Sequence, residues 1–219
     1  PNATQESCWP GLRPTRPTWS SQYRPVRLIY WRTMTTATAT ALSRLIHRAV
    51  EISPDGYLRA PFDETFRSDA EFDVDEDGFA RWRPVPQQPG IDFTGLQHAL
   101  DLTLHDDVMS YYSLFWAGTV EATSGEGELS LIQLWNQKDF ERLVANLIGH
   151  ALTKRRAKKP FTAFFANTDP ETELFLSVDN ESGTVLLEEP GGRVIKEIDT
   201  DLATFLDRIS PSPRLPDLY

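Results

Sequence analysis

The segment from Asp73 to Gly78 has the residue types of a calcium-binding loop. Its sequence, DVDEDG, places Asp73, Asp75 and Asp77 at alternate positions and glycine at the sixth. Carboxylate oxygens at this spacing are the ligands that Ca²⁺ prefers in an EF-hand. The twelfth position of such a loop supplies a bidentate glutamate, but here it is Pro84, and the flanking residues lack a helical pattern. We therefore favour a solvated acidic loop and expect no metal or other cofactor.

The same segment belongs to a larger acidic cluster, in which eight carboxylates within fifteen residues are opposed in that stretch only by Arg67. The eight are Asp63, Glu64, Asp69, Glu71, Asp73, Asp75, Glu76 and Asp77. Like charges packed this densely attract a cationic partner. An exposed ion pair contributes only ~0–1 kcal/mol, so tight binding also requires aromatic anchors. The candidates are Trp82, Trp116, Tyr111 and Tyr112, for each of which core packing is the alternative.

Motifs of known enzyme classes are absent from the sequence. The histidines, at positions 47, 98, 105 and 150, form no HExxH, and no GxSxG, GxxxxGK[ST] or GxGxxG occurs. His105, Asp106 and Asp107 are the nearest approach to an acid–base cluster, but adjacent residues on a helix do not face each other. We expect His150 to be a packed or bridging imidazole, and the protein to be non-catalytic.

A basic run, KRRAKK, occupies positions 154–159 at the end of the strongest helical pattern. Cations there complement the helix dipole by ~0.3–1 kcal/mol each, so we expect a structural cap. Contact with lipid headgroups is the alternative. Nucleic-acid binding is disfavoured because the net charge of the 219-residue chain is −10.

Composition bounds the class of protein. At 40 % hydrophobic residues the chain can bury a core, and its length suits one domain. The single cysteine, Cys8, excludes an intramolecular disulfide framework. Residues 1–33 are rich in arginine and proline without apolar periodicity, so we expect a disordered extension that precedes a start at Met34. A functional basic arm is the alternative for this segment.

The remaining pattern predicts alternating helices and strands. Leucine, isoleucine and valine recur at helical spacing in residues 41–52, 137–158 and 201–209, and TGLQHALDL reads as a helix with Thr94 as its N-cap. Asn136 is a second N-cap candidate. Residues 59–80 read as irregular, and residues 106–116 are ambiguous. Strands are expected at 79–86, 117–123, 128–135, 162–168, 173–179, 184–189 and 193–198.

Two features of this pattern suggest the topology. SGEG at 124–127 favours a hairpin, and the tight connections NESG and PGG make the last three strands a meander. We predict a single α+β domain in residues 34–219, with a curved, mostly antiparallel sheet flanked by helices, which we place on one face.

The order of several motifs resembles the Syd family of SecY-interacting proteins. They are WRPVP, LHDDVMSYYSLFWAG, LIQLWNQKDF, the segment NLIGHALTKRRAKKPFTAFFANTD, and DNESGTVLLEEPGG. The resemblance runs from about Tyr57 to Pro211 and leaves residues 1–33 without a counterpart. It implies a protein of the SUKH superfamily with a curved sheet backed by helices, in agreement with the pattern above.

The resemblance also implies a function. Syd-like proteins are taken to bind SecY at the cytoplasmic face of the inner membrane through an acidic concave surface, and to restrain or monitor translocase that is improperly assembled. The implied localisation is therefore peripheral on the inner membrane as well as cytoplasmic, and we expect a monomer. The alternative within the superfamily is an immunity protein that neutralises a toxin, which a neighbouring toxin gene would indicate.

Combining charge pattern and resemblance, we predict contacts from the acidic cluster to the basic cytosolic loops of SecY. The predicted partner-binding residues are Asp63, Glu64, Glu76, Asp77, Asp107, Glu121, Trp82 and Trp116. Asp107 enters through the pattern LHxDxxxYY, in which it could equally cap a helix.

Overall fold

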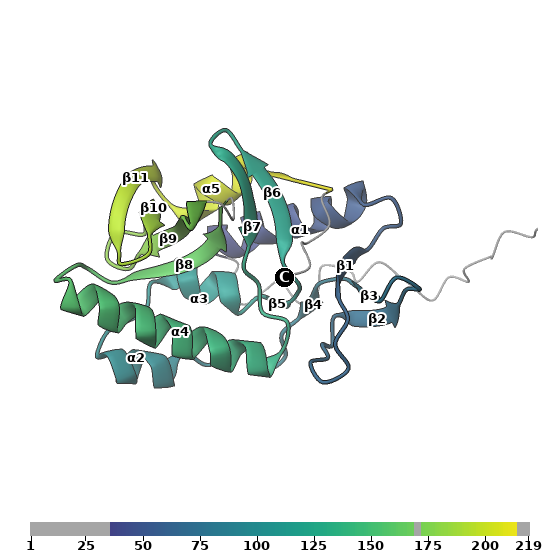
Figure 1. Ribbon diagram of the computed structural model, residues 1–219, viewed down its shortest axis with the longest axis horizontal. Coiled ribbons are helices and arrows are strands. Elements are labelled where there is room, and N and C mark those ends of the chain that lie inside the picture. Colours follow the sequence, from purple (N-terminus) through teal and green to yellow (C-terminus); the bar gives the residue numbers. More distant parts are fainter. Residues whose placement is uncertain (1–35, 169–171, 214–219) are drawn as a thin grey trace, which may run out of the picture. The chain divides into compact units, whose positions relative to one another are not determined.

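A computed structural model describes residues 36–168 and 172–213, which form five helices and twelve strands (Figure 1). The helices are α1 (Ala37–Ile52), α2 (Thr94–Leu100), α3 (Asp106–Tyr112), α4 (Gln137–Arg156) and α5 (Leu202–Arg208). The strands are β1 (Leu58–Pro61), β2 (Glu71–Val74), β3 (Phe79–Trp82), β4 (Val85–Pro86), β5 (Phe115–Trp116), β6 (Val120–Ser124), β7 (Gly127–Leu131), β8 (Thr162–Asn167), β9 (Phe175–Asp179), β10 (Val185–Glu189), β11 (Arg193–Asp199) and β12 (Ser210–Pro211). The predictions for residues 1–33 and for a start at Met34 lie outside the described residues.

Seven strands form one antiparallel sheet in the order β11-β10-β9-β8-β7-β6-β12. The predicted β6–β7 hairpin and β9–β10–β11 meander are confirmed, and β7 is an interior strand as expected. Register shifts in β8 and β10 interrupt the ladder, and such bulges bend a sheet. At one edge β11 pairs with β10 alone among the described strands, and its Val194 and Ile195 are exposed.

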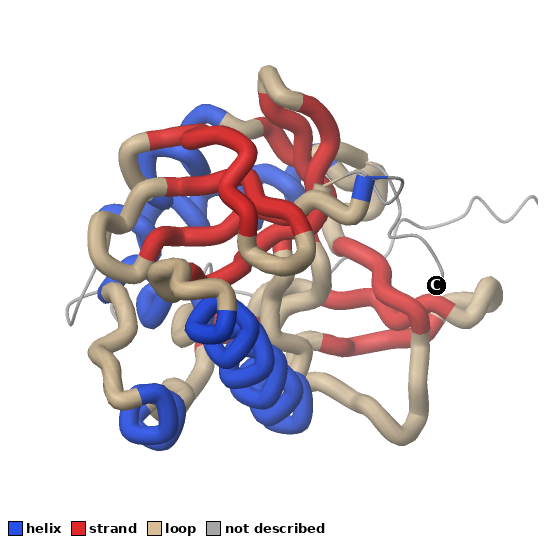
Figure 2. Tube along the Cα trace, turned by 60° about the vertical axis from the view of Figure 1, so that its left-hand side comes forward, coloured by secondary structure: helices blue, strands red, loops and turns tan. Residues whose placement is uncertain are grey.

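Helices cover both faces of this sheet, as Figures 1 and 2 show, so our placement of them on one face is wrong. Ser177 of β9 and Glu188 of β10 face α4, where Glu188 pairs with Lys154. The neighbouring residues Leu176 and Leu187 point to the opposite face of the sheet, where they line a cavity together with Phe205 of α5. Because successive side chains of a strand point to opposite faces, α4 and α5 lie on opposite faces of the sheet.

The main hydrophobic core lies between the sheet and α1, α3 and α5. Leu42, Leu45, Ile46 and Ala49 of α1 are buried, and α1 packs against α3 and α5. Phe165 of β8 lies between Tyr111 of α3 and Phe205 of α5, with ring centroids 5.7 Å away in both cases. Tyr111 and Tyr112 are therefore core residues and not partner contacts, which was the alternative that we gave for them. Their hydroxyls donate to backbone carbonyls of β8.

Capping residues fix where the helices begin. Asn136 accepts from the Asp139 N–H at 3.0 Å, which confirms it as the N-cap of α4. The prediction of Thr94 as an N-cap is wrong. Thr94 is the first residue of α2, and both its N–H and its hydroxyl donate to the Asp92 carboxylate, at 2.8 and 2.6 Å. The Asp92 carboxylate, two positions earlier, closes the turn instead.

Three short strands after α1 form a second sheet, in the order β1-β3-β2. Our reading of residues 59–80 as irregular is therefore wrong for β1 and β2. Each has only four residues, and charged residues on them hide the alternation that predicts a strand. Residues 62–69, which we call the acidic loop, connect β1 to β2. Within the described part of the chain, no helix is both long and apolar enough to cross a bilayer.

Candidate partner-binding surface

The acidic loop is held against the start of α4 by hydrogen bonds. The indole N–H of Trp135 donates to the Phe66 carbonyl at 2.9 Å, and the Asn136 amide donates to the Arg67 carbonyl at 2.7 Å. The Ser68 hydroxyl donates to the Trp135 carbonyl at 2.5 Å. These bonds fix the backbone of the loop, so its projecting carboxylates are preorganised and lose little conformational entropy when a partner binds.

Local contacts also order the side chains of this loop. The N–H and hydroxyl of Thr65 both donate to Asp63 at 2.8 Å, and these bonds lower the pKa of Asp63. The guanidinium of Arg142, on α4, lies 4.6 Å from the centroid of the Phe66 ring. Asp63 therefore stays ionised in mildly acidic solution while Phe66 ties the loop to the helix.

The DVDEDG segment forms the turn between β2 and β3. The Asp75 carboxylate accepts from the N–H groups of Asp77 and Phe79, at 3.2 and 2.9 Å, and Gly78 has φ +83°. Asp75 also pairs with Arg59 of β1 at 3.2 Å. These contacts give the segment a structural role in a hairpin, in which Asp75 closes the turn and is turned away from solvent.

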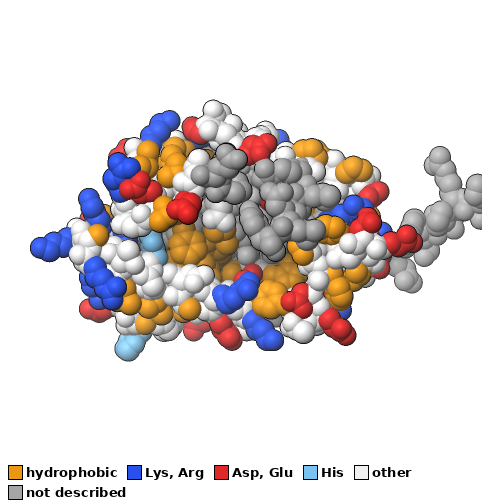
Figure 3. All heavy atoms as spheres, in the orientation of Figure 1, with side chains coloured by type: hydrophobic (Ala, Val, Ile, Leu, Met, Phe, Trp, Pro, Cys, Tyr) orange, Lys and Arg blue, Asp and Glu red, His pale blue; other side chains and the backbone are white. Residues whose placement is uncertain are grey.

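Arginines from the sheet neutralise part of the acidic cluster, so Arg67 is not its only counter-charge. Glu71 pairs with Arg67 at 2.5 Å, Asp73 with Arg81 at 2.7 Å, and Asp75 with Arg59. The exposed members without an ion pair in the described part of the chain are Asp63, Glu64, Asp69, Glu76 and Asp77. Figure 3 shows acidic side chains gathered with interspersed cations on the side where β1–β3 lie.

The two predicted tryptophan anchors have different positions. Trp82 is fully buried beneath the β1–β3 sheet, with its ring 6.1 Å from that of Trp135 in an edge-to-face arrangement. The prediction of Trp82 as a partner contact is therefore wrong, because a 0 % exposed side chain cannot touch a partner. Trp116 of β5 is half-buried, and its backbone forms a parallel bridge to Leu134, so it stays a candidate contact.

The two predicted extensions of the cluster do not join it on the surface. Asp107 accepts from the Thr38 hydroxyl at the first turn of α1 and lies 3.7 Å from His105. From Thr38, α1 runs 14 residues further to Ile52, about 21 Å at about 1.5 Å per residue, before the chain continues to β1. Glu121 of β6 is buried and accepts from the Ser130 hydroxyl at 2.7 Å.

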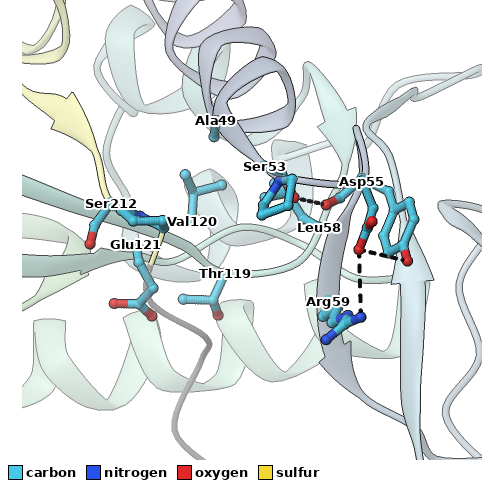
Figure 4. A pocket seen from close by; sticks show the side chains of 12 residues that line it. Ala49, Ser53, Asp55, Leu58, Arg59, Thr119, Val120, Glu121 and Ser212 are labelled. Atoms are coloured by element: carbon cyan, nitrogen blue, oxygen red, sulfur yellow. Dashed lines mark hydrogen bonds and ion pairs between the residues drawn. The ribbon is translucent and has the colours of Figure 1, made fainter. Parts of the chain in front are cut away.

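Glu121 lines a pocket of about 240 Å³ between the end of α1, β1 and β6. Figure 4 shows Glu121 and Arg59 on opposite sides of this pocket, with Thr119 between them. Asp55 lies beside Arg59, 3.7 Å from its guanidinium. The pocket thus has a carboxylate on each side and an arginine, which suits a polar or cationic side chain of a partner.

A groove of about 880 Å³ continues from Thr119 along α4, over β7, β8 and β9. Its floor is apolar, and its rim carries polar side chains. The apolar residues are Ile132, Leu134, Leu143, Phe164, Leu174 and Phe175. Arg142 lines the groove and also packs on Phe66, so the acidic loop borders one end of the groove. This groove could not be predicted from sequence, because its residues come from four separate segments.

His150 stands in this groove as the bridging imidazole that we predicted. Its Nε2 lies 2.9 Å from the Thr162 hydroxyl, and the rings of Phe161, Phe164 and Phe175 surround it at 5.8–6.3 Å. Beneath it, Lys154 and Glu188 form a buried ion pair at 2.5 Å, to which Ser177 donates. The sequence did not predict this pair.

The pKa of His150 gives a testable pH dependence. Burial lowers it below the ordinary value of 6.5, and Lys154 adds to the shift while Glu188 opposes it. Between the ordinary and the lowered value, the unfolded chain binds a proton that the folded chain does not, so the free energy of unfolding falls with falling pH. Urea unfolding measured at about pH 7.5 and at about pH 5 should show that the free energy of unfolding falls less in His150→Gln than in the wild type.

The exposed His98 provides the control for this experiment. His98→Gln should retain the pH dependence of the wild type, because its imidazole makes no hydrogen bond or ion pair in the described part of the chain. An unchanged dependence in His150→Gln would contradict the assignment to His150.

Comparison with known proteins assigns the chain to a family. The family model of the Syd protein (SUKH-2) matches residues 38–211, which include the seven-stranded sheet, the β1–β3 sheet, the acidic loop and the groove. This chain belongs to the Syd family. The resemblance seen in the sequence is thereby confirmed.

Two Syd proteins illustrate the extent of the similarity. Protein Syd of Pseudoalteromonas atlantica is 47 % identical over 131 residues, which cover 60 % of this chain and 70 % of that protein. Protein Syd of Alteromonas mediterranea is 34 % identical over 171 residues, which cover 78 % and 94 % respectively. The Syd match thus spans nearly all the described residues.

Proposed function

We propose that this chain is a non-catalytic regulator that binds the basic cytosolic loops of SecY at the cytoplasmic face of the inner membrane. In this role it would restrain or monitor improperly assembled translocase. Membership in the Syd family supports the choice of partner. The cytosolic loops of a membrane protein are enriched in Lys and Arg, which makes them complementary to an acidic surface.

One observation carries the proposal. Unpaired carboxylates project from a loop whose backbone is fixed to α4, directly beside a groove with an apolar floor. A basic segment can place Lys or Arg against Asp63 and Glu64 while its apolar side chains contact the half-buried Phe164 and Phe175. The charges speed and orient association, and the apolar floor supplies the desolvated contacts that hold the complex.

This division of roles predicts how binding responds to salt. Exposed charges are screened beyond a Debye length of about 8 Å at physiological ionic strength, so the association rate should fall as salt rises. The dissociation rate should change less, because it depends on the buried apolar contacts. Surface plasmon resonance with peptides that copy the SecY loops separates the two rates.

Charge reversal of the acidic loop is the direct test. Asp63→Lys/Glu64→Lys should weaken binding to purified SecYEG about tenfold or more at physiological salt, because two attractive contacts become repulsive. Neither side chain has an ion pair in the described part of the chain, and both are exposed. Asp63 gives up only its two local hydrogen bonds from Thr65, so the overall fold should be preserved. Glu76→Lys/Asp77→Lys, measured in parallel, reports whether the β2–β3 turn belongs to the same surface.

The matched control reverses two exposed carboxylates elsewhere. Glu181→Lys/Glu197→Lys produces the same change in net charge on the β9–β11 side of the sheet. It should weaken binding by less than about threefold, through the long-range field alone. Equal losses in the control and the loop variant would refute the placement of the site, and no binding by the wild type would refute the partner.

A further inference from the structure

The last turn of α4 and the residues directly after it carry cations that the proposed function does not use. Arg155, Arg156, Lys158 and Lys159, which we call the basic end, are all exposed. Residues 142–168 contain no Asp or Glu, in a chain whose net charge is −10. Figure 3 shows Lys and Arg side chains gathered where α4 ends. The molecule therefore has a local positive field within an overall negative charge.

The fold uses only part of the basic run. Lys154 turns inward to Glu188 and is 1 % exposed. Arg155 donates to the Leu100 carbonyl at 3.0 Å, so it caps α2 as well as lying at the surface. Arg156, Lys158 and Lys159 make no ion pair and no side-chain hydrogen bond in residues 36–168 and 172–213. Their charges remain available to a ligand, beyond the structural cap that we predicted.

The backbone at Lys158 is a second observation. α4 ends in a Schellman motif, in which the N–H of Lys159 donates to the Lys154 carbonyl and that of Lys158 to the Arg155 carbonyl. Lys158 has φ +54°, at the position where glycine is strongly preferred because it has no Cβ. The chain thus retains a cation at a site where glycine would be less strained, which points to a use for the charge.

An exposed apolar residue lies on the same face of the helix. Leu152 is 43 % exposed, and Leu152, Arg155 and Arg156 follow the spacing i, i+3, i+4 at the end of α4, with Lys158 and Lys159 directly beyond its last residue. Residues at this spacing share one side of a helix. A face that combines leucine with several Lys and Arg side chains suits the boundary between lipid headgroups and acyl chains.

We infer that the basic end of α4 binds the surface of an anionic phospholipid membrane, with the lipid phosphates as ligands of its cations. Each Lys or Arg near such a surface raises the partition coefficient roughly fivefold, so four raise it on the order of several hundredfold. Binding of this strength is reversible and needs a second contact to be firm. Duplex DNA fits less well, because it offers Leu152 no apolar layer and its extended charge would meet the carboxylates of the chain.

The inference is independent of the proposed function, because vesicles without SecY test it. Co-sedimentation of the full chain at low salt should show binding to vesicles rich in phosphatidylglycerol and none to pure phosphatidylcholine vesicles. Arg156→Gln/Lys159→Gln should lower the partition coefficient about twenty- to thirtyfold. Arg48→Gln/Lys138→Gln removes the same charge from α1 and from the opposite end of α4, and should lower it less than about threefold.

Lys158→Gly separates the charge from folding. It should reduce vesicle binding about fivefold while the urea midpoint of unfolding stays the same or rises, because glycine relieves the positive φ. Equal losses in the control variant, or no binding to anionic vesicles at low salt, would overturn the inference. So would a duplex DNA that displaces the vesicles and binds through Arg156 and Lys159.

Discussion

Lys154→Met is expected to lower the free energy of unfolding by about 3–5 kcal/mol, among the largest effects of any single substitution in this chain. Lys154 and Glu188 are 1 % and 0 % exposed, and the ammonium lies 2.5 Å from the carboxylate. Removal of the ammonium leaves a desolvated carboxylate whose remaining partner is the Ser177 hydroxyl. Equilibrium unfolding in urea measures the loss directly.

The double variant Lys154→Met/Glu188→Leu provides the decisive comparison. It replaces both charges with apolar groups of similar size, so most of the lost stability should return. A deficit of about 1 kcal/mol should remain, because Ser177 loses its acceptor. The control is Arg156→Met, which removes an exposed cation from the same helix. It should change the free energy of unfolding by less than about 0.5 kcal/mol. A double variant no more stable than the single one would contradict this account.

Trp82→Ala is expected to destabilise the chain by about 3–5 kcal/mol and to abolish partner binding with it. The indole fills the space beneath the β1–β3 sheet against Trp135, and a Cβ on Gly118 would lie 2.8 Å from its ring. Loss of the ring leaves a cavity under the strands that flank the acidic loop. Urea unfolding, followed by SecYEG binding at a temperature where the variant is folded, measures both effects.

Trp82→Phe distinguishes packing from contact at this position. The indole N–H of Trp82 has no hydrogen-bond partner in the described part of the chain, so phenylalanine loses ring volume but no hydrogen bond. It should retain partner binding within about threefold, with a smaller loss of stability than alanine. A Trp82→Phe variant that remains fully folded yet loses binding would contradict the assignment of Trp82 to packing alone.

The sequence predicted the parts of the fold that depend on local pattern. α4 shows apolar residues through several turns, with Asn136 before its first residue, and the β6–β7 hairpin has a glycine-containing turn. β1 and β2 escaped prediction because each has only four residues and is stabilised by pairing with β3, up to 24 positions away in the sequence. Short strands of this kind are defined by tertiary contacts more than by propensity.

The site was predictable in its charge and much less in its geometry. The acidic cluster is visible in the sequence, but its partial neutralisation by Arg59 and Arg81 requires the sheet. Lys154 could have been recognised, since it continues the buried stripe of Leu147 and Ala151 at helical spacing. Its partner Glu188 lies 34 positions further along, and nothing local links the two. The groove joins four separate segments and exists only in the folded chain.

The exposed edge at β11 bears on how the protein behaves at high concentration. Two copies aligned antiparallel about Lys196 would bring their ammonium groups directly opposite each other, and this repulsion opposes edge-to-edge stacking. The irregular register between β10 and β11 further distorts the ladder that an incoming strand would have to match. Lys196 therefore acts as a gatekeeper against fibre formation, and its conversion to an apolar residue would leave Val194 and Ile195 on an unguarded strand.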